Sequence, residues 1–256
     1  MVRKRKKNRD PKFKDGSEPL ILSLGKELKM TRRKQGKFVA IEGGDFCGKT
    51  TFAAQLERVL LYRGISCDQT RLPGGDQVGE MMRRVLVNQP LDARARAYLF
   101  AANRAHLSQH VLRPLINLGR NFICTRWKWS SNVYQGYVGL TNKLDDLVDV
   151  IQPDAYVLLE CTDEVMERGL KAKRDREDPN NDEVDLLDEE HTENYQMIKD
   201  RYRDEYENHQ GTKFKYVYNK GGEKQTDQEF IEEFKELLEW FGYFEREQEI
   251  PFHHET

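Results

Sequence analysis

The feature that most constrains this chain is a glycine-rich loop between an apolar segment and an amphipathic segment. Residues 43–50 read GGDFCGKT, which fits the pattern G-x-x-x-x-G-K-[ST] at every fixed position. Before the loop, the apolar run over residues 37–42 predicts a buried parallel strand. After the loop, apolar residues recur at helical spacing over residues 49–63. A strand, a glycine loop and a helix in this order predict a phosphate-binding loop.

Each fixed position of the loop has a physical task. Gly43 and Gly48 allow backbone angles at which successive N–H groups point at phosphate oxygens. The N-terminus of the following helix directs its partial positive charge at the same oxygens. Lys49 supplies a charge for the β- and γ-phosphates, and the Thr50 hydroxyl is placed to ligate Mg²⁺. We therefore expect ATP to bind along the loop, at Gly43, Gly44, Asp45, Phe46, Cys47, Gly48, Lys49, Thr50 and Thr51.

Strand and helix patterns alternate through the rest of the central part of the chain. Further strands are predicted over residues 66–70, 121–125, 155–160 and 214–218. Helices are predicted over residues 77–88, 92–117, 130–137, 144–150, 163–173 and 227–241. Strands separated by helices indicate a parallel sheet that is covered on both faces. We expect an α/β, three-layer P-loop NTPase fold with a central parallel sheet of about five strands.

The two ends of the chain differ from its middle. Residues 1–37 hold 14 of the 42 Lys and Arg residues but only 4 of the 44 Asp and Glu residues. We interpret residues 1–36 as a basic, disordered or loosely packed extension, with nucleic-acid contact or a targeting role as the alternatives. It would precede one domain over residues 37–241, followed by a polar tail over residues 242–256. The charged stretch over residues 174–190 is predicted to be a mobile loop.

Cysteine usage and hydropathy predict the compartment. The four cysteines lie far apart in the sequence without a CxxC pair, which argues against a zinc site or a disulfide framework. No apolar run approaches the eighteen or so residues of a membrane span. The N-terminus is charged from Arg3 onward and has no apolar secretory region. We therefore expect a cytoplasmic protein without a membrane partner.

Four later segments carry side chains that suit a second nucleotide. Residues 70–75 (TRLPGG) leave a strand end, where open α/β sheets bind ligands. Phe100 and Arg104 lie four residues apart on one helix face, pairing an aromatic ring for a base with a guanidinium for its phosphate. Residues 125–127 (TRW) end another strand, and residues 130–136 follow with hydroxyl and amide groups.

In this order, the segments resemble the thymidylate kinase (dTMP kinase) family. In that family, a phosphate loop is followed by T-R-E-P-G-G, F-x-A-x-R on a helix, D-R-[YHS], S-x-x-Y-Q-G and a lid. The matching segments run collinearly over residues 38–241: FVAIEGGDFCGKTT (38–51), TRLPGG (70–75), LFAANR (99–104), Arg126 and SNVYQG (131–136). The resemblance implies ATP- and Mg²⁺-dependent phosphorylation of dTMP to dTDP, and a homodimer.

The resemblance also implies roles for single residues. Asp45 matches the carboxylate that approaches the acceptor 3′-hydroxyl and the metal, so Asp45 and Thr50 are the implied Mg²⁺ ligands. Arg71, Arg104 and Arg126 match arginines around the acceptor phosphate and the transferred group. The implied dTMP-binding residues are Asp45, Arg71, Phe100, Arg104, Arg126, Ser131, Tyr134 and Gln135. Among them, Phe100 matches the ring that stacks on thymine.

The resemblance places a catalytic arginine in a lid over about residues 172–190. Some members carry this arginine in the phosphate loop, but Phe46 stands at that position here. Arg174 and Arg176 in the lid would then have to supply it, by closing over ATP and excluding water. The implied catalytic residues are Lys49, Arg126, Asp45, Arg174 and Arg176. A solvated loop of mixed charge is the alternative interpretation of this segment.

Three residues depart from the family pattern. Thr125 replaces the Asp before the arginine, Leu72 replaces the Glu of T-R-E-P-G-G, and Trp127 stands at the third position of D-R-[YHS]. Three carboxylates remain as candidates near Mg²⁺: Glu42, Asp45 and Glu160. The departures leave two alternatives open. One is a kinase for another deoxynucleoside monophosphate, such as dUMP or a 5-modified pyrimidine, and the other is a catalytically impaired nucleotide-binding homologue.

Overall fold

A computed structural model of the chain describes residues 35–136, 139, 144, 149–174, 195–221 and 225–243, without the side chains of residues 173 and 174. The chain divides into two compact units, Met1–Lys34 and Gln35–Thr256, and every described residue belongs to the second unit. Several predictions therefore lie wholly or largely outside the described residues: the basic extension over 1–36, the helix over 144–150, the lid over about 172–190 and the polar tail over 242–256.

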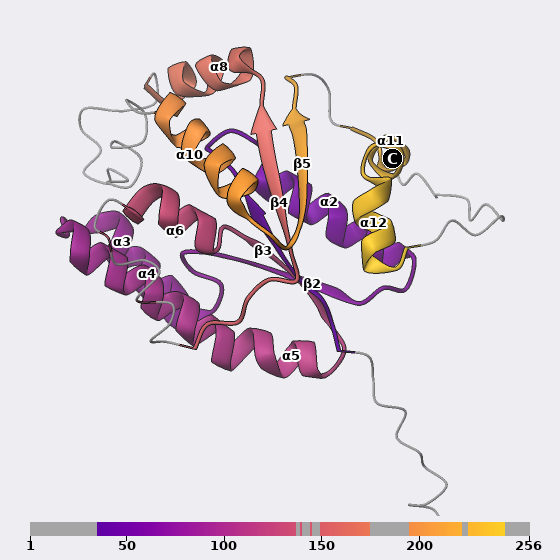
Figure 1. Ribbon diagram of the computed structural model, residues 1–256, viewed down its shortest axis with the longest axis horizontal. Coiled ribbons are helices and arrows are strands. Elements are labelled where there is room, and N and C mark those ends of the chain that lie inside the picture. The colour runs from indigo at the N-terminus through magenta and orange to yellow at the C-terminus, as the bar shows by residue number, and fades with distance from the viewer. Residues whose placement is uncertain are drawn as a thin grey trace, which may run out of the picture. The chain divides into compact units, whose positions relative to one another are not determined.

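A five-stranded, fully parallel sheet forms the centre of the second unit, as the alternating pattern predicts (Figure 1). Its strands are β1 (Phe38–Glu42), β2 (Cys67–Arg71), β3 (Asn121–Thr125), β4 (Ala155–Cys161) and β5 (Thr212–Asn219). Their order across the sheet is β2-β3-β1-β4-β5. The central strand β1 is buried along its whole length, which explains its uninterrupted apolar sequence.

Helices cover both faces of the sheet and make it the middle of three layers (Figure 1). They are α2 (Lys49–Tyr62), α3 (Gln77–Asn88), α4 (Ala93–Leu107), the π-helix η1 (Ser108–Leu112), α5 (Arg113–Asn117), α6 (Lys128–Gln135), α8 (Asp163–Arg174), α10 (Tyr195–Asn208), α11 (Asp227–Glu233) and α12 (Lys235–Phe241). Side chains cap several N-termini. The Asp76 carboxylate accepts from Gly79 N, and Thr226 forms a capping box with Glu229.

Successive residues of β1 face opposite layers, as the pleat of a strand requires. Val39 and Ile41 belong to a core shared with α2, α11 and α12. Phe38 and Ala40 belong to a second core shared with α5, α6 and α10. Both cores are apolar and fully enclosed, so β1 and the loop that follows it are held from two sides.

Three elements differ from the sequence prediction. The helix predicted over 92–117 is interrupted by η1, because Pro114 has no N–H to continue the α-helical ladder and the turn before it is wound more widely. The helix predicted over 227–241 breaks at Phe234, whose ring is fully buried against Phe52. Helix α10 was not predicted, because charged residues surround its three buried positions: Tyr195, Ile198 and Tyr202.

The strand order places two loops side by side. The chain leaves β1, crosses to β2 at the sheet edge and returns to β3, which pairs directly with β1. The carboxyl ends of β1 and β3 are therefore adjacent, with Ile41 opposite Thr125. Ligands of open α/β sheets bind at such switch points. The phosphate loop after β1 consequently lies beside the turn after β3.

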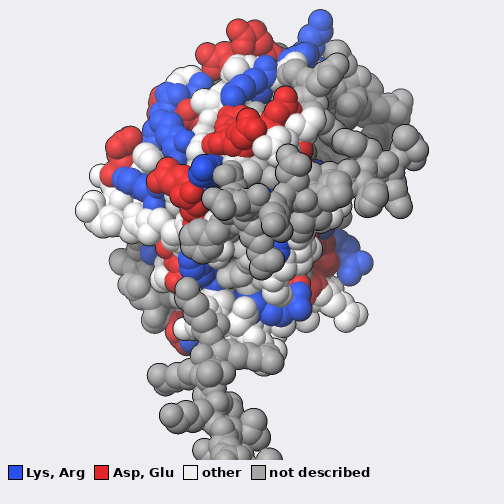
Figure 2. Space-filling view, turned by 90° about the vertical axis from the view of Figure 1, so that its right-hand side faces the viewer, with Lys and Arg blue, Asp and Glu red and all other residues white. Residues whose placement is uncertain are grey.

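The described part of the chain carries side chains of both charges on its surface. Basic and acidic side chains are interspersed on the face shown in Figure 2, rather than gathered into one field of either sign. Of the helices that the structure describes, none has the length and apolar character needed to cross a bilayer.

Candidate active site

The phosphate loop takes the backbone conformation that its glycines allow. Gly43 has φ 142° and lies so close to β4 that a Cβ there would be 2.2 Å from the Leu159 carbonyl oxygen. Gly48 has φ 78° and caps α2, which begins at Lys49. The Lys49 Nζ donates to the Gly44 carbonyl oxygen at 2.5 Å, so the lysine folds back over its own loop. This arrangement directs the ammonium and the N-terminus of α2 at the same space.

Burial and two nearby charges determine the pKa of Lys49. Burial within the loop is the largest effect and lowers the pKa of Lys49 to about 8; the nearby Arg126 charge lowers it further, whereas Asp45 raises it. The lysine is half-buried by surface area, so water still reaches part of the side chain. A polyphosphate placed beside Lys49 would stabilise the ammonium and oppose this lowering of the pKa.

Arg126 contacts several elements around the site. It follows β3 with φ 67°, a left-handed conformation that is costly for a residue with a Cβ, and its backbone N–H donates to the Ile41 carbonyl at 2.8 Å. Its guanidinium forms an ion pair with Asp45 of the phosphate loop. It also donates to the hydroxyls of Tyr134 on α6 at 3.3 Å and Tyr202 on α10 at 3.2 Å. Arg126 therefore links the phosphate loop with two helices on the other side of the site.

A buried carboxylate fixes the turn that carries Arg126. Glu42, at the end of β1, is fully buried and accepts from Trp127 N at 2.8 Å, Ser130 N at 3.3 Å and Ser130 Oγ at 2.5 Å. Burial raises the pKa of Glu42, and the hydrogen bonds from Ser130 and Trp127 oppose this. These donors tie Glu42 to the turn after β3, so the carboxylate anchors that turn.

The carboxylate of Glu160 is also held by a neighbouring side chain. Glu160, on β4, forms an ion pair with Arg203 of α10, with Oε1 and Nε 2.8 Å apart. Of the three carboxylates considered from the sequence, Asp45 is thus the one that lies in the phosphate loop. Its partner, Arg126, is a side chain that can also bind phosphate.

The helix α4 holds a second arginine beside α6. Arg104 is almost fully buried, and its Nη1 donates to Ser131 Oγ. The neighbouring Asn103 clamps the turn after β2: its Oδ1 accepts from Gly74 N at 2.8 Å and its Nδ2 donates to Gly74 O at 3.1 Å. Asn103 was not predicted as a site residue, although it lies within the LFAANR motif. Its two bonds connect that motif with the TRLPGG motif.

Three other residues that the sequence predicted for the acceptor nucleotide lie on β2, α4 and α6. Arg71 ends β2 opposite Thr125, is largely exposed, and pairs with Glu80 of α3 at 3.0 Å. Phe100 is half-buried on α4, one turn before Arg104, and Gln135 is buried on α6. Arg71, Arg104 and Arg126 are thus carried by β2, α4 and the turn after β3.

Two of the three departures from the family pattern lie in the core. Leu72 and Trp127 are 5% and 1% exposed, and both belong to the apolar core beneath α5, α6 and α10. The Trp127 ring packs edge-on against Phe38 at 5.1 Å, and its Nε1 donates to the Ile151 carbonyl. Thr125 is half-buried at the end of β3. These positions assign Leu72 and Trp127 to packing rather than to ligand contact.

Helix α8 leads into the segment that was predicted to form a lid. Arg174 ends α8, and its side chain and all of Arg176 lie outside the described residues. Earlier in α8, Gly169 packs against Phe46, since a Cβ there would be 2.5 Å from Phe46 Cδ1. Cys47 of the loop lies close to β4, with its Sγ 3.8 Å from Cys161 Sγ. The phosphate loop therefore contacts both α8 and the end of β4.

A cavity of about 830 Å³ opens beside the N-terminus of α2. Gly48 and Thr51 form one side, Tyr218 and Asn219 continue from the end of β5, and Thr226 begins α11 on the opposite side. Asn219 Nδ2 donates to the Phe46 carbonyl at 2.7 Å, which ties this wall to the phosphate loop. The volume is within the usual range for sites of small organic ligands.

This fold and site define a phosphotransferase of the P-loop nucleoside monophosphate kinase class. A family model described as thymidylate kinase matches residues 41–230, which is more than half of the chain. The chain belongs to the thymidylate kinase family.

Individual relatives agree with this assignment. A thymidylate kinase of Caldicellulosiruptor saccharolyticus is 36% identical over 157 residues, covering 57% of this chain and 76% of that protein. A thymidylate kinase of Clostridium novyi is 34% identical over 179 residues, covering 66% and 83%. The crystal structure of a thymidylate kinase from Ehrlichia chaffeensis superposes with a TM-score of 0.59 and 22% identity, covering 80% of this chain and 99% of that one. This last likeness confirms the fold.

Proposed function

We propose that this protein transfers the γ-phosphoryl group of ATP to dTMP, which yields dTDP and ADP. The observation that carries the proposal is the position of Arg126. Its guanidinium pairs with Asp45 inside the phosphate loop while it also bonds Tyr134 on α6. The same arginine therefore lies between the loop that would hold ATP and the helix whose motif resembles an acceptor site.

Positioning and charge neutralisation supply most of the catalysis in phosphoryl transfer. Lys49 and the N-terminus of α2 are proposed to hold the ATP phosphates, so that a phosphate oxygen of dTMP attacks the γ-phosphorus and the bond to ADP breaks. Arg126 would neutralise charge on the group in transit. Arg71 and Arg104 are proposed to hold the acceptor phosphate, and Phe100 to stack on thymine. Base and sugar would be contacted by Ser131, Tyr134, Gln135 and Asp45.

The donor set suits a Mg²⁺ ion that arrives with the nucleotide. Within the part of the chain that the structure describes, no group of three or more His, Cys, Asp and Glu side chains could cage an ion. Mg²⁺ ordinarily keeps several waters and takes one or two protein oxygens together with substrate phosphates. The Thr50 hydroxyl and the Asp45 carboxylate, both at the phosphate loop, meet that need. When bound, the ion would neutralise negative charge on the phosphate oxygens.

Two further parts of the proposal concern segments beyond the site itself. The catalytic arginine is proposed to come from Arg174 or Arg176 in a lid that begins at the end of α8, since Phe46 brings no charge to the loop. The kinase domain is proposed to span residues 37–241, between a basic extension and a polar tail. A cytoplasmic location stays a prediction; all four cysteines are free and buried, as a reducing compartment favours.

A homodimer is proposed as the working form. Helix α3 exposes Val78, Met81 and Val85, which are 40%, 56% and 40% accessible. Their spacing places them on one face of the helix. A face of this kind on a monomer is suited to association with a second copy.

A panel of monophosphates tests the proposed function. The purified chain is incubated with ATP, Mg²⁺ and one of dTMP, dUMP, dCMP or dGMP, and ADP release is coupled to an optical readout. We expect dTMP to have the highest kcat/KM, by at least about tenfold, because the site must match its base and its phosphate together. Absence of turnover with dTMP would contradict the proposal. A preference for another monophosphate would correct the acceptor but retain the reaction class.

A further inference from the structure

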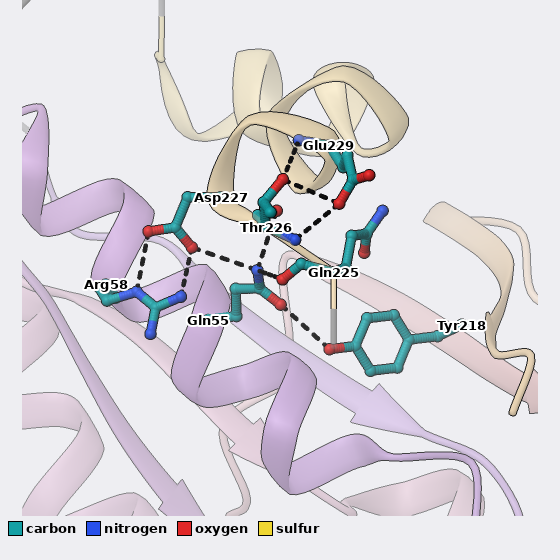
Figure 3. Close-up of polar contacts among 7 residues, drawn as sticks. All are labelled: Gln55, Arg58, Tyr218, Gln225, Thr226, Asp227 and Glu229. Atoms are coloured by element: carbon teal, nitrogen blue, oxygen red, sulfur yellow. Dashed lines mark hydrogen bonds and ion pairs between the residues drawn. The ribbon is translucent and has the colours of Figure 1, made fainter. Parts of the chain in front are cut away.

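A buried glutamine connects the two ends of the cavity beside α2. Gln55 lies on α2, one turn after Thr51, and is only 6% exposed. Its Nε2 donates to the carbonyl oxygens of Gln225 at 3.0 Å and Thr226 at 3.3 Å, and to Asp227 Oδ1 at 3.2 Å. Figure 3 shows this amide pointing from the helix into the turn before α11.

The oxygen atom of the Gln55 amide is hydrogen-bonded as well. Gln55 Oε1 accepts from the Tyr218 hydroxyl at 3.2 Å. A side-chain amide is the group that supplies donors on one atom and an acceptor on the other, so the two contacts together fix its orientation. A methionine of similar shape would supply neither kind of bond, and a glutamate could not donate. The position therefore depends on the amide and not only on side-chain volume.

The groups that Gln55 holds are walls of the cavity. Tyr218, Gln225 and Thr226 all line it. The Tyr218 ring also lies against the phosphate loop, where a Cβ on Gly48 would be 3.0 Å from it. Gln55 consequently fixes the far wall of the cavity relative to the helix whose first residue is Lys49.

A second tie lies on the next turn of α2. Arg58 forms an ion pair with Asp227, with Nε and Oδ2 3.1 Å apart (Figure 3). Its side chain is 54% exposed, so solvent screens this pair and its contribution is small. Of these two contacts, the hydrogen bonds of the buried Gln55 amide are the ones that hold the cavity wall in place.

We propose that Gln55 is a positioning residue for the donor nucleotide. It touches no reacting atom; it keeps the wall that would receive the nucleoside part of ATP at a fixed distance from the loop that would receive its phosphates. The inference rests on the proposed function, because it requires the donor to lie across the phosphate loop and the cavity together. It predicts that Gln55 governs donor affinity and leaves acceptor affinity alone.

The test compares two ligands that differ in the part of the site they reach. ADP would span the loop and the cavity, whereas inorganic tripolyphosphate would contact only the loop. In Gln55→Met, we expect the Kd of ADP to rise about tenfold, since buried hydrogen bonds to the wall are lost. The Kd of tripolyphosphate and the KM of dTMP should change less than about twofold. Isothermal titration calorimetry and steady-state kinetics give these values.

The matched control is Gln69→Met. Gln69 Nε2 also reaches α2, through Glu57 Oε2 at 2.7 Å, but neither residue lines the cavity. This variant should leave the ADP affinity unchanged. If Gln55→Met does not fold, Gln55→Asn keeps the amide but shortens the side chain by one methylene, so it cannot reach both walls and gives the same readout.

The outcomes separate this inference from the proposed function. Equal weakening of ADP and tripolyphosphate would show that Gln55 only supports the loop, and unchanged ADP affinity would show that the wall is irrelevant; either result overturns the inference. A wild-type chain that binds ADP but transfers nothing to dTMP would overturn the proposed function and leave the Gln55 comparison intact. A wild-type chain that binds no ADP would overturn both.

Discussion

At the scale of single residues, the site depends on one strained arginine and one buried carboxylate. Arg126 takes a left-handed backbone conformation at the end of β3, and Glu42 holds the following turn through Trp127 N and Ser130. Backbone strain of this kind costs about 1–3 kcal/mol and persists where neighbouring contacts enforce it. The same turn aims the guanidinium at Asp45. We therefore expect activity and stability to respond differently to substitution here.

Replacing Arg126 tests whether activity and stability respond differently. Arg126→Ala and Arg126→Gly should both lower kcat by about 10³-fold, since each removes the cation proposed to neutralise the transferred group. Arg126→Gly should nevertheless be more stable than Arg126→Ala by about 1 kcal/mol, because glycine adopts φ 67° without strain. Urea unfolding and the coupled kinase assay measure the two quantities. Equal stability of the two variants would argue against strain at this position.

The pKa of Lys49 gives a pH dependence with a defined sign. Burial lowers this pKa from the usual 10.5 to about 8, so the ammonium of the nucleotide-free protein is present below pH 8 and lost as the pH rises through 8. A bound polyphosphate stabilises the ammonium. ATP affinity is thus expected to fall above about pH 8, with proton uptake on binding. Calorimetry in two buffers of different ionisation enthalpy measures that uptake.

Lys49→Arg serves as the comparison for the pH effect. An arginine stays charged throughout the range, so any binding that this variant retains should show no step near pH 8. Wild-type binding at pH 8.5 without proton uptake would contradict the assignment of the step to Lys49.

At the scale of elements, the contact between the phosphate loop and α8 is unusually close. Gly169 lies inside α8, where an alanine would ordinarily stabilise the helix by about 0.8–1.0 kcal/mol. Here an added Cβ would be 2.5 Å from Phe46 Cδ1 and 2.6 Å from its Cγ, so the ring and the loop that carries it would have to move. Helix α8, which leads into the proposed lid, therefore packs directly against the phosphate loop.

Gly169→Ala tests the importance of the contact between α8 and the phosphate loop. We expect the variant to raise the KM for ATP several-fold, because the Phe46 ring is forced away and distorts the loop between Asp45 and Cys47. Adding Phe46→Ala removes the clash, so the double variant should bind ATP better than Gly169→Ala alone. Steady-state kinetics on both single variants and the double variant give the KM values for ATP that complete the double-mutant cycle. A strictly additive result would show that the contact has no effect on the loop.

Which elements the sequence could predict depended on how local their signals are. The strand before Gly43, the loop and α2 follow from residue type and spacing, and the structure has all three. Helix α10 was missed because its buried positions are two tyrosines and one isoleucine among charges. The spacing of these three, at i, i+3 and i+7, was the signal that could have identified it. Its Tyr202 supplies one of the hydroxyls around Arg126.

At the scale of the whole molecule, the proposed homodimer requires an exposed apolar face. Met81→Glu together with Val85→Glu places two charges on that face of α3. We expect the wild-type chain to have about twice the 30.2 kDa mass of one chain in solution, and the double variant to be monomeric. Light scattering after size exclusion measures the mass. Leu118→Glu, at another exposed apolar position, is the control and should remain dimeric.

The general architecture was predictable from sequence, but the connections between motifs were not. Alternating strands and helices predicted the parallel sheet, and the ordered motifs predicted the family. Contacts such as Asn103 with Gly74, or Gln55 with the turn before α11, join segments 29 and about 170 residues apart. Gln55 reads in sequence as an ordinary polar position of a helix. Only the packed fold shows that it is buried and which groups it holds.

The proposed function requires that the phosphate loop and the residues around Arg126 form one site that passes a phosphoryl group between two nucleotides. Single-turnover mixing of excess protein with [γ-³²P]ATP, Mg²⁺ and dTMP tests it most directly. We expect the label to appear in dTDP, with little inorganic phosphate, and to stay in ATP when dTMP is omitted. Label released only as inorganic phosphate, or retained in ATP when dTMP is present, would contradict it.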